Sequence, residues 1–201
     1  MHRHTVEPLR KRADGAANFG FGLGNSEKTL GIELNVTSFS TIRSGFFHHS
    51  SFSFKIHREL TRNLAVAYGW EDAIRTKGLD GGTSMYWVAT AGIPLRQNPG
   101  SPFSSVTITG GVGNGRFQRE QDFYAGKNGL NPFGSVGLHI FSPISLIADW
   151  TGQDLMLGAS IVPFTRIPLF ITPSFADVTG SAGDGARFVI GAGLDFNFAK
   201  R

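Results

Sequence analysis

The residues best suited to chemistry lie around a short turn in the second half of the chain. His139 precedes the predicted turn at Ser142-Pro143 and Ser145 follows it, so two strands joined there would place the two side chains next to each other. Ser160 and Asp149 are predicted on the same face, and a Ser–His pair with a carboxylate is the basis of nucleophilic catalysis. The strand pattern, however, puts His139 inside the fold near the short turns. We therefore predict no catalytic residue and no enzymatic activity.

Three other patterns resemble ligand sites but lack the context that such sites need. Gly111-Val-Gly-Asn-Gly115 is glycine-rich like a phosphate-binding loop, yet no predicted helix follows it to hold a phosphate. The pairs His2-x-His4 and His48-His49 lack further ligands at metal-site spacing. The acidic loops at residues 72–83 and 177–186 lack calcium-loop spacing, and the chain has no cysteine. We predict no metal and no cofactor.

The elements that must position these residues are β-strands. Leu30, Ile32, Leu34 and Val36 alternate with small or polar residues, and the same period returns in residues 64–70, 144–150 and 188–198. Period 2 gives a strand one apolar and one polar face. We therefore predict an all-β fold, a single antiparallel transmembrane β-barrel of about 10–12 strands.

Eleven segments carry the strand pattern, and most are 8–11 residues long, close to the length of about 9–11 residues with which a tilted strand crosses a bilayer. They are residues 17–24, 29–41, 50–58, 63–71, 84–94, 104–113, 133–141, 144–151, 155–162, 169–176 and 187–198. Short turns gather at one predicted end and longer loops at the other, as in outer-membrane barrels. Residues 1–15 are predicted as a polar N-terminal arm and residues 16–201 as the barrel.

Composition supports a barrel with little surface built to face water. Charged residues make up 17% of the chain, against roughly a quarter in ordinary soluble domains. No basic stripe with interleaved aromatic residues is present, so we predict no nucleic-acid partner. The N-terminus lacks the apolar segment of a secretory signal, and we expect that a leader or a first strand precedes this sequence.

The residue types of the polar face indicate which face of the predicted barrel points inward. Its residues are small, with sparse charges of both signs, whereas a water-facing exterior would carry many Lys and Glu side chains. We therefore favour the apolar face outward over a soluble, lipocalin-like barrel with that face inward. The lumen-facing polar residues are predicted to be Glu33, Lys55, His57, His139, Asp149 and Asp195. Charges in this space should form at least one ionic network.

Aromatic residues are predicted to gather near the long-loop rim. Trp70 and Trp150 close two predicted strands, Trp87 opens another, and Tyr68 is close to Trp70 in sequence. Trp and Tyr favour the boundary between hydrocarbon and head groups because their rings are apolar and their edges are polar. We predict an aromatic girdle made of Tyr68, Trp70, Trp87 and Trp150.

The final segment, residues 187–198, resembles the aromatic-rich closing strand of bacterial outer-membrane proteins, although Ala199-Lys200-Arg201 follow its last Phe. Gly20-Phe-Gly-Leu-Gly24, Phe54-Lys-Ile-His57 and Asp149-Trp-Thr-Gly152 are similar to segments of uncharacterised cyanobacterial barrel proteins. The resemblance implies an outer membrane, bacterial or of an organelle envelope, and one further strand before residue 17. Because single-chain bacterial barrels normally have an even strand number, we expect ten strands, a twelfth from residues 1–15, a parallel closure, or a strand from a neighbouring chain.

The predicted partner is membrane lipid. The leading functional prediction is a narrow pore for small solutes, or a structural membrane component, without enzymatic activity. Barrels of this size often have interiors filled by side chains, so an open pore is not implied by strand number alone. The alternative is a lipid-modifying or hydrophobic-ligand-binding membrane barrel.

Overall fold

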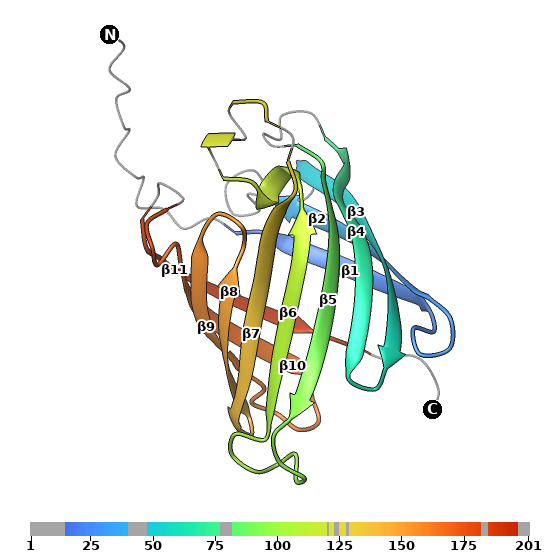
Figure 1. Ribbon diagram of the computed structural model, residues 1–201, viewed down its shortest axis with the longest axis vertical. Coiled ribbons are helices and arrows are strands. Elements are labelled where there is room, and N and C mark those ends of the chain that lie inside the picture. The colour runs from blue at the N-terminus through green and yellow to red at the C-terminus, as the bar shows by residue number, and fades with distance from the viewer. Residues whose placement is uncertain are drawn as a thin grey trace.

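The computed structural model describes residues 15–39, 48–76, 82–119, 121–122, 125–127, 129–181 and 185–196, which form one antiparallel sheet of eleven strands (Figure 1). The strands are β1 (Ala17–Gly24), β2 (Gly31–Phe39), β3 (His49–Thr61), β4 (Leu64–Arg75), β5 (Ser84–Pro94), β6 (Ser105–Gly113), β7 (Asn131–Phe141), β8 (Ile144–Trp150), β9 (Leu155–Ile161), β10 (Leu169–Ala176) and β11 (Arg187–Leu194). The all-β prediction is confirmed. His2, His4 and nearly all of the predicted arm, together with residues 197–201 at the chain end, lie outside the described residues.

Every strand pairs with its neighbours in sequence, so the sheet is a meander. Local turn chemistry explains this order. In the β1–β2 connection, the Asn25 N–H donates to the Leu30 carbonyl at 3.1 Å, and the Asn25 side chain accepts the Lys28 N–H at 2.9 Å. Asn stabilises turns because its side chain replaces a backbone acceptor. Such short connections bring consecutive strands together antiparallel.

A single turn of 3₁₀ helix, η1 (Gly115–Phe117), follows β6. No helix in the described ranges is both long and apolar enough to cross a membrane.

The alternation in the sequence gives the sheet two chemically different faces. Leu34 is paired directly with Phe54 on one face, while the adjacent Glu33 is paired with Lys55 on the other. The apolar face is open, with Trp87 63% and Ile190 65% exposed. Of the residues that the structure describes, Phe117 and Ala176 are the only apolar ones that are buried. The described sheet therefore does not enclose an apolar core.

The two ends of the sheet differ in their connections. Two-residue turns join β3 to β4 and β7 to β8, whereas residues 114–130, which include η1, join β6 to β7 (Figure 1). There are exceptions at both ends: residues 151–154 form a short turn at the long-loop end, and residues 95–104 form a longer connection at the short-turn end. The sheet curls, so that β5 to β8 run down the front in Figure 1 while β1, β10 and β11 pass behind them.

The β3–β4 hairpin extends further than the sequence predicts. The prediction ended the second strand at Glu71, but β4 continues to Arg75, which pairs with Ser51. A register shift between Phe52 and Phe54 separates this extension from the rest of the ladder. Since a β-bulge lets a ladder bend and continue, β4 runs past Glu71, the last residue that it pairs with β5, and stays paired with β3 as far as Arg75. Trp70 consequently lies within β4 and does not close it, which corrects the prediction.

The first and last strands of the sheet, β1 and β11, each have one edge without a neighbouring strand among the described residues. β1 pairs with β2 over its whole length, from Ala17 opposite Ser38 to Gly24 opposite Gly31, so the ten-strand arrangement without β1 is wrong. β1 and β11 are the first and last strands of the ladder among the described residues. In an antiparallel meander all odd-numbered strands run the same way. β1 and β11 therefore run in the same direction.

Candidate functional site

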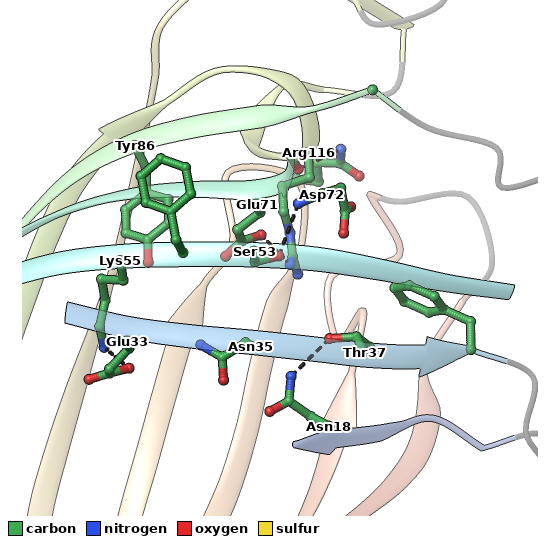
Figure 2. Close-up of a pocket in the computed structure, with 14 residues that line it drawn as sticks. Asn18, Glu33, Asn35, Thr37, Ser53, Lys55, Glu71, Asp72, Tyr86 and Arg116 are labelled. Atoms are coloured by element: carbon green, nitrogen blue, oxygen red, sulfur yellow. Dashed lines mark hydrogen bonds and ion pairs between the residues drawn. The ribbon is translucent and has the colours of Figure 1, made fainter. Parts of the chain in front are cut away.

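The polar face of the sheet lines a cavity of about 610 Å³ (Figure 2). Its walls come from β1 to β5, from η1 and from the turn between β8 and β9. The cavity is thus built by segments more than a hundred residues apart in sequence. Charged groups of both signs line it: Glu33, Lys55, Glu71, Asp72 and Arg116.

The first ionic cluster combines Glu33, Lys55 and His57. The Lys55 Nζ lies 2.8 Å from the Glu33 Oε2, and the His57 Nδ1 lies 3.6 Å from Glu33 Oε1. The register explains this contact, because Lys55 is directly opposite Glu33 and His57 is the next residue of β3 on the same face. The side chains of Glu33 and Lys55 are 37% and 32% exposed, so water still reaches the pair. Three of the predicted lumen residues are therefore brought together.

The second ionic contact was not predicted from the sequence. Arg116, in η1, extends to Glu71 on β4, with 2.6 Å between the guanidinium Nη1 and the carboxylate Oε2 (Figure 2). Burial acts to lower the pKa of Arg116, but the nearby carboxylates of Glu71 and Asp72 outweigh it, and the pKa is raised. The guanidinium therefore stays charged. Because its side chain is 63% exposed, we assign the pair a positioning role and little net stability.

Backbone contacts hold η1 in the position from which Arg116 reaches the cavity. The Arg116 N–H donates to Ser84 Oγ at 3.0 Å, and the Gln153 side chain donates to the Arg116 carbonyl at 3.0 Å. Gly115 has a φ of 61°, a left-handed conformation that favours glycine. These two hydrogen bonds connect η1 to the start of β5 and to the β8–β9 turn.

Asp72 supplies a carboxylate next to this contact. Its φ is 54°, in the left-handed region that non-glycine residues seldom adopt, and its N–H donates to Ser53 Oγ at 3.0 Å. Asp tolerates this conformation better than most residues. The conformation places Asp72 among the residues that line the cavity (Figure 2).

Aromatic rings lie on the polar face of the sheet because glycines stand opposite them, and one of them, Tyr86, lines the cavity. Gly69 is paired with Tyr86, and Gly111 with Phe133, and a Cβ atom at either glycine would overlap the ring of its partner. Phe117 stacks on Phe133 with 4.2 Å between ring centroids, and Tyr86 meets Phe117 edge-on at 5.6 Å. The glycines thus let large rings lie flat on this face.

The structure pairs His139 with Ser145 across β7 and β8, as the turn at Ser142-Pro143 predicted, and Ser145 with Ser160 across β8 and β9. The carboxylate needed for catalysis is not beside them. Asp149 is opposite Ser135, and four residues along β8 place it about 13 Å from Ser145. The His139 Nδ1 is buried and has no hydrogen-bond partner within the described chain. The arrangement lacks the base–carboxylate contact of a catalytic triad.

The remaining predicted residues lie apart from the cavity clusters. Asp195 is exposed just beyond β11, where its N–H donates to the Pro168 carbonyl at 3.2 Å. Trp87 and Tyr68 are direct cross-strand partners on the apolar face, with ring centroids 4.7 Å apart. Trp70 packs edge-on against Phe54 at 5.6 Å, and Trp150 is the last residue of β8. Of the four predicted girdle residues, Tyr68 and Trp87 thus pair with each other, whereas Trp70 contacts Phe54.

Comparison with known proteins adds no assignment. No family model, curated protein or solved structure matches this chain. Among the described residues, no group of three or more His, Asp or Glu side chains is arranged to hold a metal ion. The features of the molecule that bear on function are therefore the two chemically different faces of the sheet and the charged cavity.

Proposed function

We propose that this chain is a transmembrane β-barrel of the outer-membrane type, similar to the cyanobacterial barrels that its motifs resemble. In this proposal the polar cavity is the lumen of a narrow pore for small solutes. The observation that carries the proposal is the exposure of the apolar face together with the charges that line the cavity. A water-soluble domain would bury its apolar face in a core and expose its charged face to water.

The exposed face is larger than a soluble monomer tolerates. Its large apolar side chains occur on strands from β1 to β11, including Phe21, Leu146 and Ile190. Monomers in water rarely expose continuous apolar patches above a few hundred Å². Moving one such side chain into an apolar environment is favourable by about 1.5–3 kcal/mol. A lipid bilayer satisfies this face without any change of the fold.

A bilayer also requires that the two sheet edges be paired. Free backbone N–H and C=O groups in hydrocarbon each cost several kcal/mol, at least about 2. Since β1 and β11 run in the same direction, direct closure would be parallel. The alternatives are an added antiparallel strand from residues 1–15 or one from a neighbouring chain. Either added strand would make an even-numbered barrel.

The cavity suits ions and small polar solutes. Arg116 and its partner Glu71 line the cavity on the long-loop side, while Glu33 and Lys55 line its wall further along the strands. Paired charges with water access provide a polar path. We place the long loops outside the cell or organelle and the short turns on the inner side of an outer membrane, as in known barrels.

Conductance recording tests the pore. The refolded full chain is added to a planar lipid bilayer, and small, uniform current steps are expected. A bilayer that contains the protein, as shown by its protection from added protease, but gives no steps would contradict the pore and leave a structural role.

A second candidate is a barrel that binds a hydrophobic ligand. It is favoured by a separate apolar groove of about 720 Å³, most of whose lining side chains lie on the outer face of β3 to β6. Co-purification of a lipid or pigment with a non-conducting protein would support this candidate over the pore.

A further inference from the structure

The groove on the apolar face has a floor of small residues and an aromatic wall. Ala89 and Gly110 are paired across β5 and β6 and form the floor, while the Tyr68–Trp87 ring pair stands beside them. A Cβ atom added at Gly110 would meet no atom within 4 Å, so the space above it is open. The groove could therefore hold a chain of methylene groups.

One cation stands at an end of this groove. Arg58 lines it, is exposed, and lies on the same apolar face as Ile56, opposite Val66 on β4. Within the described residues, Arg58 has no carboxylate at salt-bridge distance. A guanidinium on an apolar face, close to the end of β3 at Thr61, is placed to extend its charge to the membrane surface.

The register shows which way the groove runs. Direct cross-strand partners on the apolar face form a continuous row: Arg58, Val66, Ala89, Gly110, Gly134 and Trp150. The row begins near the short-turn end of β3 and finishes at the last residue of β8, at the long-loop end. A hydrocarbon chain that follows the row from Arg58 therefore runs from one rim of the sheet toward the other.

We propose that this groove binds one anionic phospholipid, with its phosphate on Arg58 and one acyl chain over Ala89 and Gly110 against the Tyr68–Trp87 wall. Guanidinium groups bind phosphate through two parallel hydrogen bonds. The unpaired cation supplies charge complementarity, and the groove supplies the apolar contact. This proposal rests on the membrane location proposed above.

The test uses Trp87 as the reporter, since its ring is 63% exposed and lines the groove. The full chain is placed in phosphatidylcholine vesicles that contain a small fraction of lipid brominated on the acyl chain, either phosphatidylglycerol or phosphatidylcholine. The difference between the wild type and Trp87→Phe isolates Trp87 fluorescence. Brominated phosphatidylglycerol should quench Trp87 several-fold more than the same fraction of brominated phosphatidylcholine.

Two variants should abolish this preference: Arg58→Gln, which removes the cation, and Gly110→Leu, which fills the floor. Matched controls are Arg166→Gln, an exposed arginine in the β9–β10 connection at the same end, and Ala192→Leu on the apolar face of β11. Both controls should keep the preference. In the unchanged chain, unlabelled phosphatidylglycerol should relieve the quenching, which tests the site even if a variant fails to fold.

The outcomes separate this inference from the proposed function. Equal quenching by the two brominated lipids, or a preference that survives Arg58→Gln, would overturn the lipid site while leaving Trp87 in the bilayer. Absence of quenching by both lipids would overturn the membrane location as well.

Discussion

At the scale of single residues, two glycines without side chains determine where aromatic rings lie on the polar face. Gly69 and Gly111 leave room for the rings of Tyr86 and Phe133 to lie flat. A side chain at Gly69 would displace the ring of Tyr86, which lines the cavity, and one at Gly111 would displace the ring of Phe133 or distort the paired strands. Glycine weakens a strand interior, and here that cost is offset by the contact between ring and backbone.

We therefore expect Gly69→Ala to lower the free energy of unfolding by about 1–3 kcal/mol, because the added methyl group overlaps the Tyr86 ring. The measurement is denaturant unfolding of the protein in lipid vesicles. Gly92→Ala on β5 is the matched control, since open space surrounds that position. Equal loss of stability in the two variants would contradict this role of Gly69.

Sequence reasoning found the Glu33, Lys55 and His57 cluster because parity alone decides which face a strand residue occupies. It could not find the contact between Glu71 and Arg116. Arg116 lies outside the regular strands, and its direction is set by hydrogen bonds to Ser84 and Gln153, which are distant in sequence. Asp149 and Asp195 are predicted in the same lumen set, but neither forms an ion pair within the part of the chain that the structure describes.

At the scale of elements, hydrophobic period predicted all eleven strands, while their ends were less well predicted. β4 extends to Arg75 because it continues to pair with β3 past a bulge. Strict alternation misses this extension, because Asp72 stands two residues after Trp70, where an apolar residue would be expected, and the register shifts there. The short helix η1 escaped prediction for a related reason: three residues are too few to show a helical period.

η1 places the Arg116 side chain in the lining of the cavity. We expect Arg116→Ala to raise the conductance of single channels, because it removes the side chain that reaches across to Glu71. Lys127→Ala is the control, because it removes the same charge from an exposed pair with Asp122 in the same connection. The two variants are compared in one planar bilayer assay. A rise of equal size in both would show that net charge, and not the position of η1, sets the current.

At the scale of the whole molecule, the two faces of the sheet differ: apolar side chains are exposed on one, and charged side chains line a cavity on the other. The period of the sequence established two faces but not which one is outside. That distinction was inferred from the small, sparsely charged residues of the polar face. In the structure, the apolar side chains are exposed and a cavity lies against the charged residues.

Spin labelling tests this central claim most directly, and the absence of cysteine lets each variant carry a single label. Cysteines are placed at three neighbouring pairs on β2, β8 and β11: Leu34 and Asn35, Leu146 and Ser145, Ile190 and Gly191. In lipid vesicles, labels at Leu34, Leu146 and Ile190 should be more accessible to oxygen, which concentrates in hydrocarbon. Labels at their three neighbours should be more accessible to a water-soluble nickel complex. The reverse pattern would contradict the account, because it would place the apolar face away from lipid.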